Sequence, residues 1–192
     1  MAATAAVLMS PATTGVALAF VVSGSAGDHA SATQPRPAAD DRYADTTMAD
    51  LLPHGVEGPQ QHLDPNPDQW KNARAIVGVV RERGLPAYAA VLSLATALQE
   101  STLRNVDVAV DHDSLGLFQQ RPSMGWGTPQ QLTDPAYATR AFLDAVSEHA
   151  PNYQSVPLWQ AAQATQRSAY PTLYAKWQEQ AAQMVLQILH EG

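Results

Sequence analysis

The sequence predicts a mainly helical fold: one domain of about five helices over residues 68–192, with a small β-turn or hairpin element. Three observations predict it. Apolar residues recur at three- and four-residue intervals through this part of the chain. Most of the 14 Pro and 11 Gly lie between those periodic segments, where turn residues are expected. At 192 residues and 45% hydrophobic content, the chain has enough apolar surface for one core.

The N-terminal residues 1–27 have the pattern of a signal peptide or a membrane anchor. A short apolar stretch, Val16 to Val22, is followed by the small residues Ser23 to Gly27. No Lys or Arg precedes Arg36, so the positive segment that usually begins a signal peptide is missing. A retained anchor is one alternative, and a disordered Ala-rich tail is another. We expect an exported protein, either secreted or held in the cell envelope outside the cytoplasm.

Residues 28–67 have the composition of a flexible linker. They mix Pro, Asp, Gly, Gln and His with little periodicity, and such a segment buries too little apolar surface to order itself. The apolar pair Leu51 and Leu52 is the one candidate for a contact with the domain that follows. The sequence therefore predicts a mobile tether that ends at the first long helix.

The first two predicted helices are the most clearly marked. Residues 68–83 carry apolar side chains at helical spacing, with Asp68 placed as the N-cap and Gly84 as the stop. Residues 86–102 begin with a proline and are too apolar for a surface helix, so we expect this helix to be buried. The remaining helices are expected over 134–149, 158–169 and 173–189.

Charge and composition exclude several functions. Eleven Lys and Arg against 18 Asp and Glu give a formal charge of -7, which argues against nucleic acid as a partner. The same sign disfavours electrostatic capture by anionic membranes or wall polymers, so a wall substrate needs a shaped groove. There is no Cys, which excludes disulfides, a thiol nucleophile and thiolate metal sites. We expect no cofactor, no metal and a monomer.

A candidate general acid stands at the end of the buried helix. Glu100 lies in the segment Ala97-Leu98-Gln99-Glu100-Ser101, and the segment Gly116-Leu117-Phe118-Gln119 begins sixteen residues after Glu100. A carboxylate near a helix C-terminus faces the negative end of the helix dipole, which favours its protonated form by about 0.3–1 kcal/mol. That is less than one pKa unit. Burial beside apolar groups must therefore provide the larger part of any rise in its pKa.

These two segments resemble the motifs of the lysozyme-like superfamily of soluble lytic transglycosylases and goose-type lysozymes. There a Glu-Ser pair closes a helix, and Gly-Leu-Met-Gln or a variant follows. Further segments are similar to secreted actinobacterial members: Asp113 to Pro122, Gly125-Trp126-Gly127 and Gln166 to Pro171. The resemblance covers roughly residues 68–178. It implies a lysozyme-like domain that cleaves the glycan strands of peptidoglycan, with Glu100 as the acid.

The motif residues supply candidates for substrate binding. Gly116 would let a glycan approach the backbone closely, and the amides of Gln119 and Gln120 would bind N-acetyl groups. Trp126 lies between glycines and is placed to stack on a sugar ring, with a core position as the alternative. Ser101 belongs to the Glu-Ser pair of the first motif. The competing interpretation is a buried turn, which we expect for Phe118.

A second carboxylate and a partner for Glu100 are less clearly marked. Asp111 and Asp113 are candidates for the second carboxylate, although each also suits a solvated turn in which it caps backbone amides. The family's third motif is usually Ala-Tyr-Asn, whose Tyr bonds the catalytic Glu, but Thr165-Gln166 stands there in this chain. Gln166 and Tyr170 are the candidates to replace that Tyr. This departure leaves three activities open: transglycosylase, hydrolase, and a non-catalytic module that only binds peptidoglycan.

Overall fold

The computed structural model describes residues 41–109, 111–167 and 170–191. These residues belong to one compact unit that is almost entirely helical, which confirms the predicted mainly helical class. The signal peptide or anchor predicted over 1–27 lies outside the described residues. Within the described ranges, no helix has the length and apolar character needed to cross a membrane. The α-helices are α1 (Met48–Leu51), α2 (Pro67–Glu82), α3 (Ala87–Ser101), α4 (Pro129–Leu132), α5 (Pro135–His149), α6 (Leu158–Gln166) and α7 (Gln178–His190). The 3-10 helices are η1 (Asp41–Tyr43), η2 (Pro122–Met124), η3 (Tyr153–Ser155) and η4 (Pro171–Trp177).

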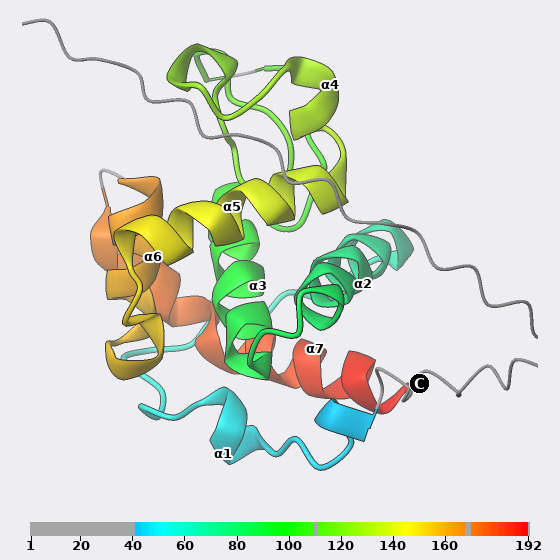
Figure 1. Ribbon diagram of the computed structural model, residues 1–192, viewed down its shortest axis with the longest axis vertical. Coiled ribbons are helices and arrows are strands. Elements are labelled where there is room, and N and C mark those ends of the chain that lie inside the picture. Colours follow the sequence, from blue (N-terminus) through cyan, green and yellow to red (C-terminus); the bar gives the residue numbers. More distant parts are fainter. Residues whose placement is uncertain (1–40, 110, 168–169, 192) are drawn as a thin grey trace, which may run out of the picture. The chain divides into compact units, whose positions relative to one another are not determined.

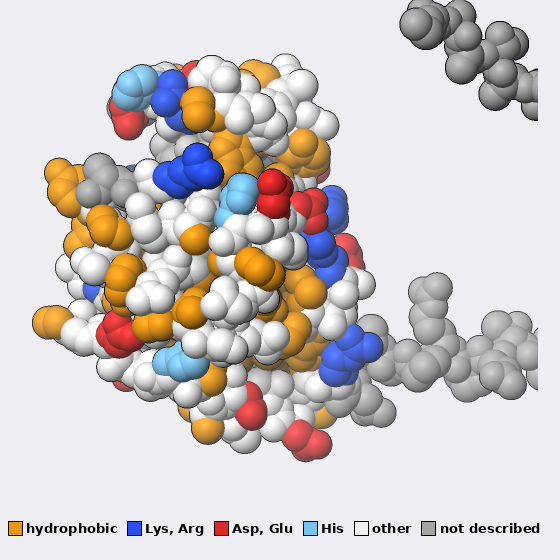
Figure 2. Space-filling model, turned by 60° about the vertical axis from the view of Figure 1, so that its left-hand side comes forward, with side chains coloured by type: hydrophobic (Ala, Val, Ile, Leu, Met, Phe, Trp, Pro, Cys, Tyr) orange, Lys and Arg blue, Asp and Glu red, His pale blue; other side chains and the backbone are white. Residues whose placement is uncertain are grey.

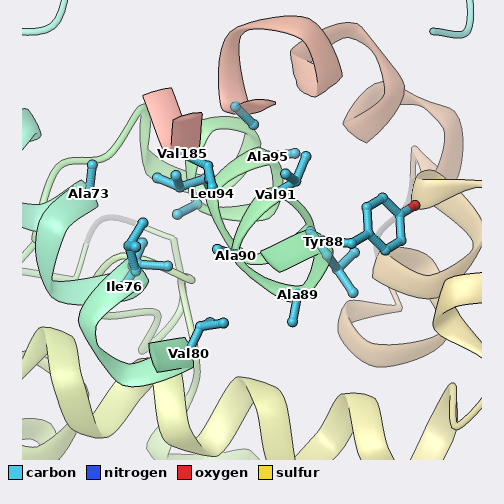
Figure 3. Close-up of a cluster of buried hydrophobic side chains, with 14 of the residues drawn as sticks. Ala73, Ile76, Val80, Tyr88, Ala89, Ala90, Val91, Leu94, Ala95 and Val185 are labelled. Atoms are coloured by element: carbon cyan, nitrogen blue, oxygen red, sulfur yellow. The ribbon is translucent and has the colours of Figure 1, made fainter. Parts of the chain in front are cut away.

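The core is built around α3, as its apolar sequence predicted. Every residue from Tyr88 to Leu98 is buried. In Figure 1, α3 stands among α2, α5, α6 and α7, and the contacts agree that α2, α7 and η4 pack on it most extensively. Figure 3 shows Ile76 of α2 in the space between α2 and α3, and Ala73 and Ala90 belong to the same buried cluster.

The beginning of α2 corrects one detail of the prediction. The N-cap is Asn66, not Asp68: the Asn66 side chain accepts from the backbone N–H of Gln69, and the Gln69 side chain accepts from the N–H of Asn66. This reciprocal pair is a capping box with Asn and Gln in place of the commoner Ser or Thr and Glu. Because Pro occupies the first helical position, it needs no amide partner there. Asp68 is exposed in the first turn.

Residues 41–66 pack on the helices, so the prediction of a flexible linker is wrong for this part of 28–67. Leu51 is completely buried, and the Tyr43 hydroxyl donates to the Leu85 carbonyl at 2.7 Å. Farther along, residues 57–63, which we call the strap, run beside η4 and α7. The sequence did not reveal this packing because the strap's partners are Gln side chains and backbone groups more than 100 residues away.

The C-terminal helices differ from the prediction in their winding. The segment expected as one helix over 173–189 is two elements, the 3-10 helix η4 and the α-helix α7. Helix α6 ends at Gln166, and α5 begins at Pro135 with Asp134, where the predicted helix starts, as its N-cap. Asp134 accepts hydrogen bonds from the first two free amides of α5.

Residues 102–132 form the part of the unit drawn above α3 and α5 in Figure 1. Two isolated antiparallel bridges, Val106 with Gly116 and Leu115 with Gln120, occur where the β-turn or hairpin element was expected. No extended strand accompanies them in the described part of this segment. The bridges fold the second of the two motif segments, Gly116-Leu117-Phe118-Gln119, back to the end of α3.

Candidate active site at the end of helix α3

Glu100 lies in the last turn of α3 and is mostly buried. Burial raises the pKa of its carboxyl above the usual value, and a hydrogen bond from Tyr174 partly opposes that rise. The Tyr174 hydroxyl donates to Glu100 Oε1 at 2.7 Å. Burial thus has the largest effect on the pKa of Glu100, as expected because the helix dipole is too weak to raise that pKa much by itself. Glu100 has the surroundings of a carboxylic acid that keeps its proton to higher pH than an exposed one.

Tyr174 was not among the predicted partners of Glu100. The candidates were Gln166 and Tyr170, but Gln166 donates to the Phe118 carbonyl at 2.8 Å, and Tyr170 is 68% exposed. Tyr174 lies in the segment that was expected as the last helix, 173–189. One general property pointed to it: a buried tyrosine hydroxyl normally has a hydrogen-bond partner.

The 3-10 winding of η4 explains how Tyr174 reaches Glu100. In a 3-10 helix, side chains three residues apart point in the same direction. Tyr174 and Trp177 are so related, and both meet the last turn of α3: Trp177 Nε1 donates to Gln99 Oε1 at 3.2 Å. Trp177 is also buried, in agreement with its predicted core position. The winding thus aligns two polar contacts with Gln99 and Glu100.

The chain turns sharply immediately after Glu100-Ser101. Thr102 and Leu103 both have positive φ values, 54° and 60°, which are uncommon for residues other than glycine. Helix α2 holds this turn: Gln69 Nε2 donates to the Thr102 carbonyl at 2.7 Å, and Asn72 Nδ2 donates to the Leu103 carbonyl at 2.9 Å. The end of α3 is therefore fixed from α2 on one side and from η4 on the other.

The second motif forms a tight turn against α3. Leu115 and Gln120 exchange two backbone hydrogen bonds of 2.9 and 3.1 Å. Ser101 Oγ donates to the Leu117 carbonyl at 2.8 Å, next to the carbonyl that Gln166 binds. Ser101 was a candidate for binding substrate and Gln166 for binding Glu100 or substrate, but here both donate to the backbone of this turn. We therefore assign them to holding the turn beside Glu100.

Two further substrate-binding predictions are corrected by burial. A Cβ atom at Gly116 would overlap the carbonyl oxygen of Leu132, so this glycine is required for packing against α4 and not for contact with a glycan. Gln120 is only 2% exposed and donates to the Ala138 carbonyl at 3.3 Å. Phe118 is buried and stacks on Phe142 with ring centroids 4.8 Å apart, as the core interpretation required.

Gln119 and Trp126 keep part of their side chains accessible. Gln119 has a φ of 48° at the bend of the turn, and its Nε2 donates to the Gly116 carbonyl at 3.0 Å. Trp126 lies between two glycines of positive φ, with its backbone carbonyl 3.4 Å from the Tyr137 hydroxyl. These two are the predicted substrate-binding residues that remain placed for an external ligand, together with the exposed Tyr170.

The two candidates for the second carboxylate, Asp111 and Asp113, lie in the acidic loop (residues 105–114), where each contacts a basic side chain. Asp113 accepts from Arg121 Nε at 2.7 Å and from the Ser123 N–H at 2.7 Å, and these bonds hold its pKa well below the usual range. Asp111 contacts the neighbouring His112 at 2.7 Å and is largely exposed. Asp113 therefore has the turn-capping role that was the alternative to catalysis, since it accepts from the first free amide of η2, that of Ser123.

The surroundings contain no metal site within the described ranges, since no three His, Asp or Glu side chains gather there. Acidic and basic side chains are interspersed on the face drawn in Figure 2, and pairs such as Arg83 with Asp144 tie neighbouring helices together. No field of one sign on this face would draw in a charged ligand.

Comparison of the chain with models of known protein families and with curated proteins gave no match. The site is therefore described by its own geometry. It consists of a buried carboxyl group on α3, a tyrosine hydroxyl that binds it, and a turn that Ser101 and Gln166 hold beside it.

Proposed function

We propose that this protein cleaves the glycan strands of peptidoglycan, with Glu100 as the general acid. The observation that carries the proposal is the buried Glu100 carboxyl, whose pKa is raised and whose Oε1 accepts from Tyr174 at 2.7 Å. An acid must keep its proton near the working pH in order to donate it to a glycosidic oxygen. The resemblance of the two motifs to lytic transglycosylases and goose-type lysozymes supports the same reaction.

The proposed reaction begins with proton transfer from Glu100 to the oxygen that links N-acetylmuramic acid to N-acetylglucosamine. The bond from that oxygen to the anomeric carbon breaks, and positive charge develops on the sugar ring. Glycosidases stabilise this charge with a second carboxylate or with the substrate's own N-acetyl group. Because Asp113 is bound by Arg121 and Ser123, we favour participation of the N-acetyl oxygen, which bonds to the anomeric carbon as the glycosidic bond breaks. The C6 hydroxyl of the same sugar then displaces that oxygen and gives its proton to the ionised Glu100, which yields a 1,6-anhydro product.

The decisive experiment is digestion of purified peptidoglycan, with mass spectrometry of the released fragments. We expect muropeptides with 1,6-anhydro ends from the native protein and none from Glu100→Gln. Glu148→Gln, on the exposed face of α5, is the matched control and should digest like the native protein. Reducing ends would instead identify a hydrolase, and an active Glu100→Gln variant would remove Glu100 from the mechanism.

A second assay addresses a module that binds without cleaving. The native protein and Glu100→Gln are each sedimented with intact sacculi. Binding by both proteins, with no fragment released by either, would reject the catalytic proposal in favour of a binding module. Release by the native protein alone supports the enzyme.

A further inference from the structure

The 3-10 helix η4 is seven residues long and depends on partners outside itself. Runs of 3-10 helix longer than three or four residues are uncommon because their hydrogen bonds have poorer geometry. The apolar spacing of this segment predicted an α-helix that continues into α7. Something in the tertiary structure must therefore favour the tighter winding, and the strap is the element that contacts η4 along its backbone.

The strap binds the backbone of η4 at two consecutive carbonyls. Gln60 Nε2 donates to the Ala175 carbonyl at 3.0 Å, and the N–H of Gln61 donates to the Lys176 carbonyl at 2.7 Å. The Gln60 side chain also accepts, at 3.0 Å, from the N–H of Glu179 in the first turn of α7. One side chain thus bridges the junction at which 3-10 winding changes to α winding.

The ends of the strap are fixed at other places. Glu57 Oε2 accepts from Trp159 Nε1 at 2.9 Å, which ties the beginning of the strap to α6. At the other end, the Gln180 side chain of α7 makes two hydrogen bonds with the backbone of Leu63, at 2.7 and 2.8 Å. Gln60 is therefore held on a braced segment, and its two bonds act on η4 from a fixed position.

We propose that Gln60 is a positioning residue for Glu100: by bridging Ala175 and Glu179 it maintains the winding of η4, which keeps Tyr174 against the Glu100 carboxyl. Ala175 directly follows Tyr174 in the chain. If η4 relaxed to α winding, Tyr174 and Trp177 would turn about 60° apart around the helix axis and would no longer both face α3. The role of Gln60 in catalysis rests on the proposed function, whereas its role in placing Tyr174 does not.

The test measures how strongly the Tyr174 hydroxyl acts on Glu100 with and without Gln60. The pKa of Glu100 is followed by NMR titration of ¹³C-labelled glutamate carboxyl groups in the full-length protein. Tyr174→Phe is expected to raise this pKa, because it removes a hydrogen bond that favours the ionised carboxylate. The same substitution is then made in Gln60→Met, which keeps the side-chain length but removes the hydrogen bonds of the Gln60 side chain, both those to Ala175 and Glu179 across the junction and those to the Glu57 and Gly58 carbonyls within the strap.

The matched control is Gln180→Met. Gln180 also bridges strap and helix with two hydrogen bonds, but it does so on α7, beyond the junction. Because Gln180 is more buried than Gln60, its replacement should lower Tm at least as much. A general loss of stability would therefore appear in both variants, and a loss of Tyr174 positioning only in Gln60→Met.

We expect the effect of Tyr174→Phe on the pKa to fall by at least half in Gln60→Met and to stay at full size in Gln180→Met. An effect of full size in both variants would overturn the proposal, as would an equal reduction in both. If Gln60→Met fails to fold, Gln60→Glu serves instead, since it keeps an oxygen that can accept from Glu179 but removes the donations to the Ala175, Glu57 and Gly58 carbonyls, and it is expected to give the same reduction. Digestion of peptidoglycan is measured in parallel, so an inactive native protein would refute the proposed function while the titration still decides the role of Gln60.

Discussion

Glu100 and Asp113 are two acidic residues that the protein treats in opposite ways. Burial raises the pKa of Glu100, whereas Arg121 and the amide of Ser123 lower that of Asp113. Glu100 receives one hydrogen bond from a neutral hydroxyl, and Asp113 receives three bonds, one of them from a guanidinium. Surroundings of this kind separate a proton donor from a permanently ionised structural carboxylate.

The comparison teaches that the motif alone does not assign chemistry to a carboxylate. Both residues lie in segments that resemble the same superfamily, and both were candidates for catalysis. The acidic loop follows the end of α3 in the chain, and the turn from Leu115 to Gln120 packs back against that end, so two neighbouring regions give their carboxylates different surroundings.

The largest expected effect is on activity. We expect Glu100→Gln to reduce peptidoglycan digestion at least about 100-fold, the usual contribution of a general acid. Asp113→Asn should retain activity within about twofold at a temperature where it is folded, since Asp113 caps a turn. Rates of muropeptide release measure both. A loss in Asp113→Asn as large as that in Glu100→Gln, with Tm unchanged, would restore Asp113 as a second catalytic carboxylate.

The next largest effect concerns the turn from Leu115 to Gln120, which packs against the end of α3. Gly116→Ala is expected to destabilise the domain by about 2–4 kcal/mol, because the new methyl group would overlap the Leu132 carbonyl at a positive φ of 71°. Gly125→Ala is the matched control, with a φ of 82° and open space around its Cβ position, and it should cost about 1 kcal/mol. Urea unfolding gives both values. Equal losses would mean that α4 yields easily and that packing does not require Gly116.

A smaller effect is expected from the hydroxyl that binds Glu100. Tyr174→Phe should lower activity about 3- to 10-fold and move the alkaline limb of the pH–activity profile to higher pH, because Glu100 holds its proton more tightly. Tyr170→Phe, on the exposed tyrosine first considered for this role, should leave the alkaline limb of the profile where it is, because Tyr170 does not bind Glu100. An effect of Tyr170→Phe with none of Tyr174→Phe would contradict the partnership seen here.

The smallest expected effect is on stability as a function of pH, and it has opposite signs for the two residues. The raised pKa of Glu100 means that its ionisation destabilises the fold as pH rises above the carboxyl's ordinary value. Glu100→Gln should therefore raise Tm at pH 7, and the gain should shrink as pH falls towards the ordinary carboxyl pKa.

For Asp113 the expected change of stability with pH has the opposite sign. Its lowered pKa stabilises the fold above the ordinary aspartate value, and this contribution is lost as pH falls through the folded-state pKa. Asp113→Asn should thus lower Tm at pH 7, with a difference that shrinks towards acid pH. Thermal unfolding between pH 3 and pH 8 measures both variants. Parallel curves for the two would show that their environments do not differ as described.

Much of the helical framework could be predicted from local sequence. The buried α3, the cap of α5 by Asp134 and the approximate bounds of α2 follow from apolar spacing and capping residues, because helices form through contacts three and four residues apart. The burial of Glu100 was also expected from its place at the edge of the apolar face. These features depend on neighbours within one or two turns of the chain.

What only the tertiary structure decided are the partners that come from far along the chain. Tyr174 reaches Glu100 across 74 residues, and Gln60 reaches Ala175 across 115. The strap and the 3-10 winding of η4 depend on such hydrogen bonds, and a hydrogen bond between distant residues leaves no periodic pattern in either segment. The sequence by itself determined which residue stands at the end of the buried helix, and the fold determined which hydroxyl and which turn surround its carboxyl group.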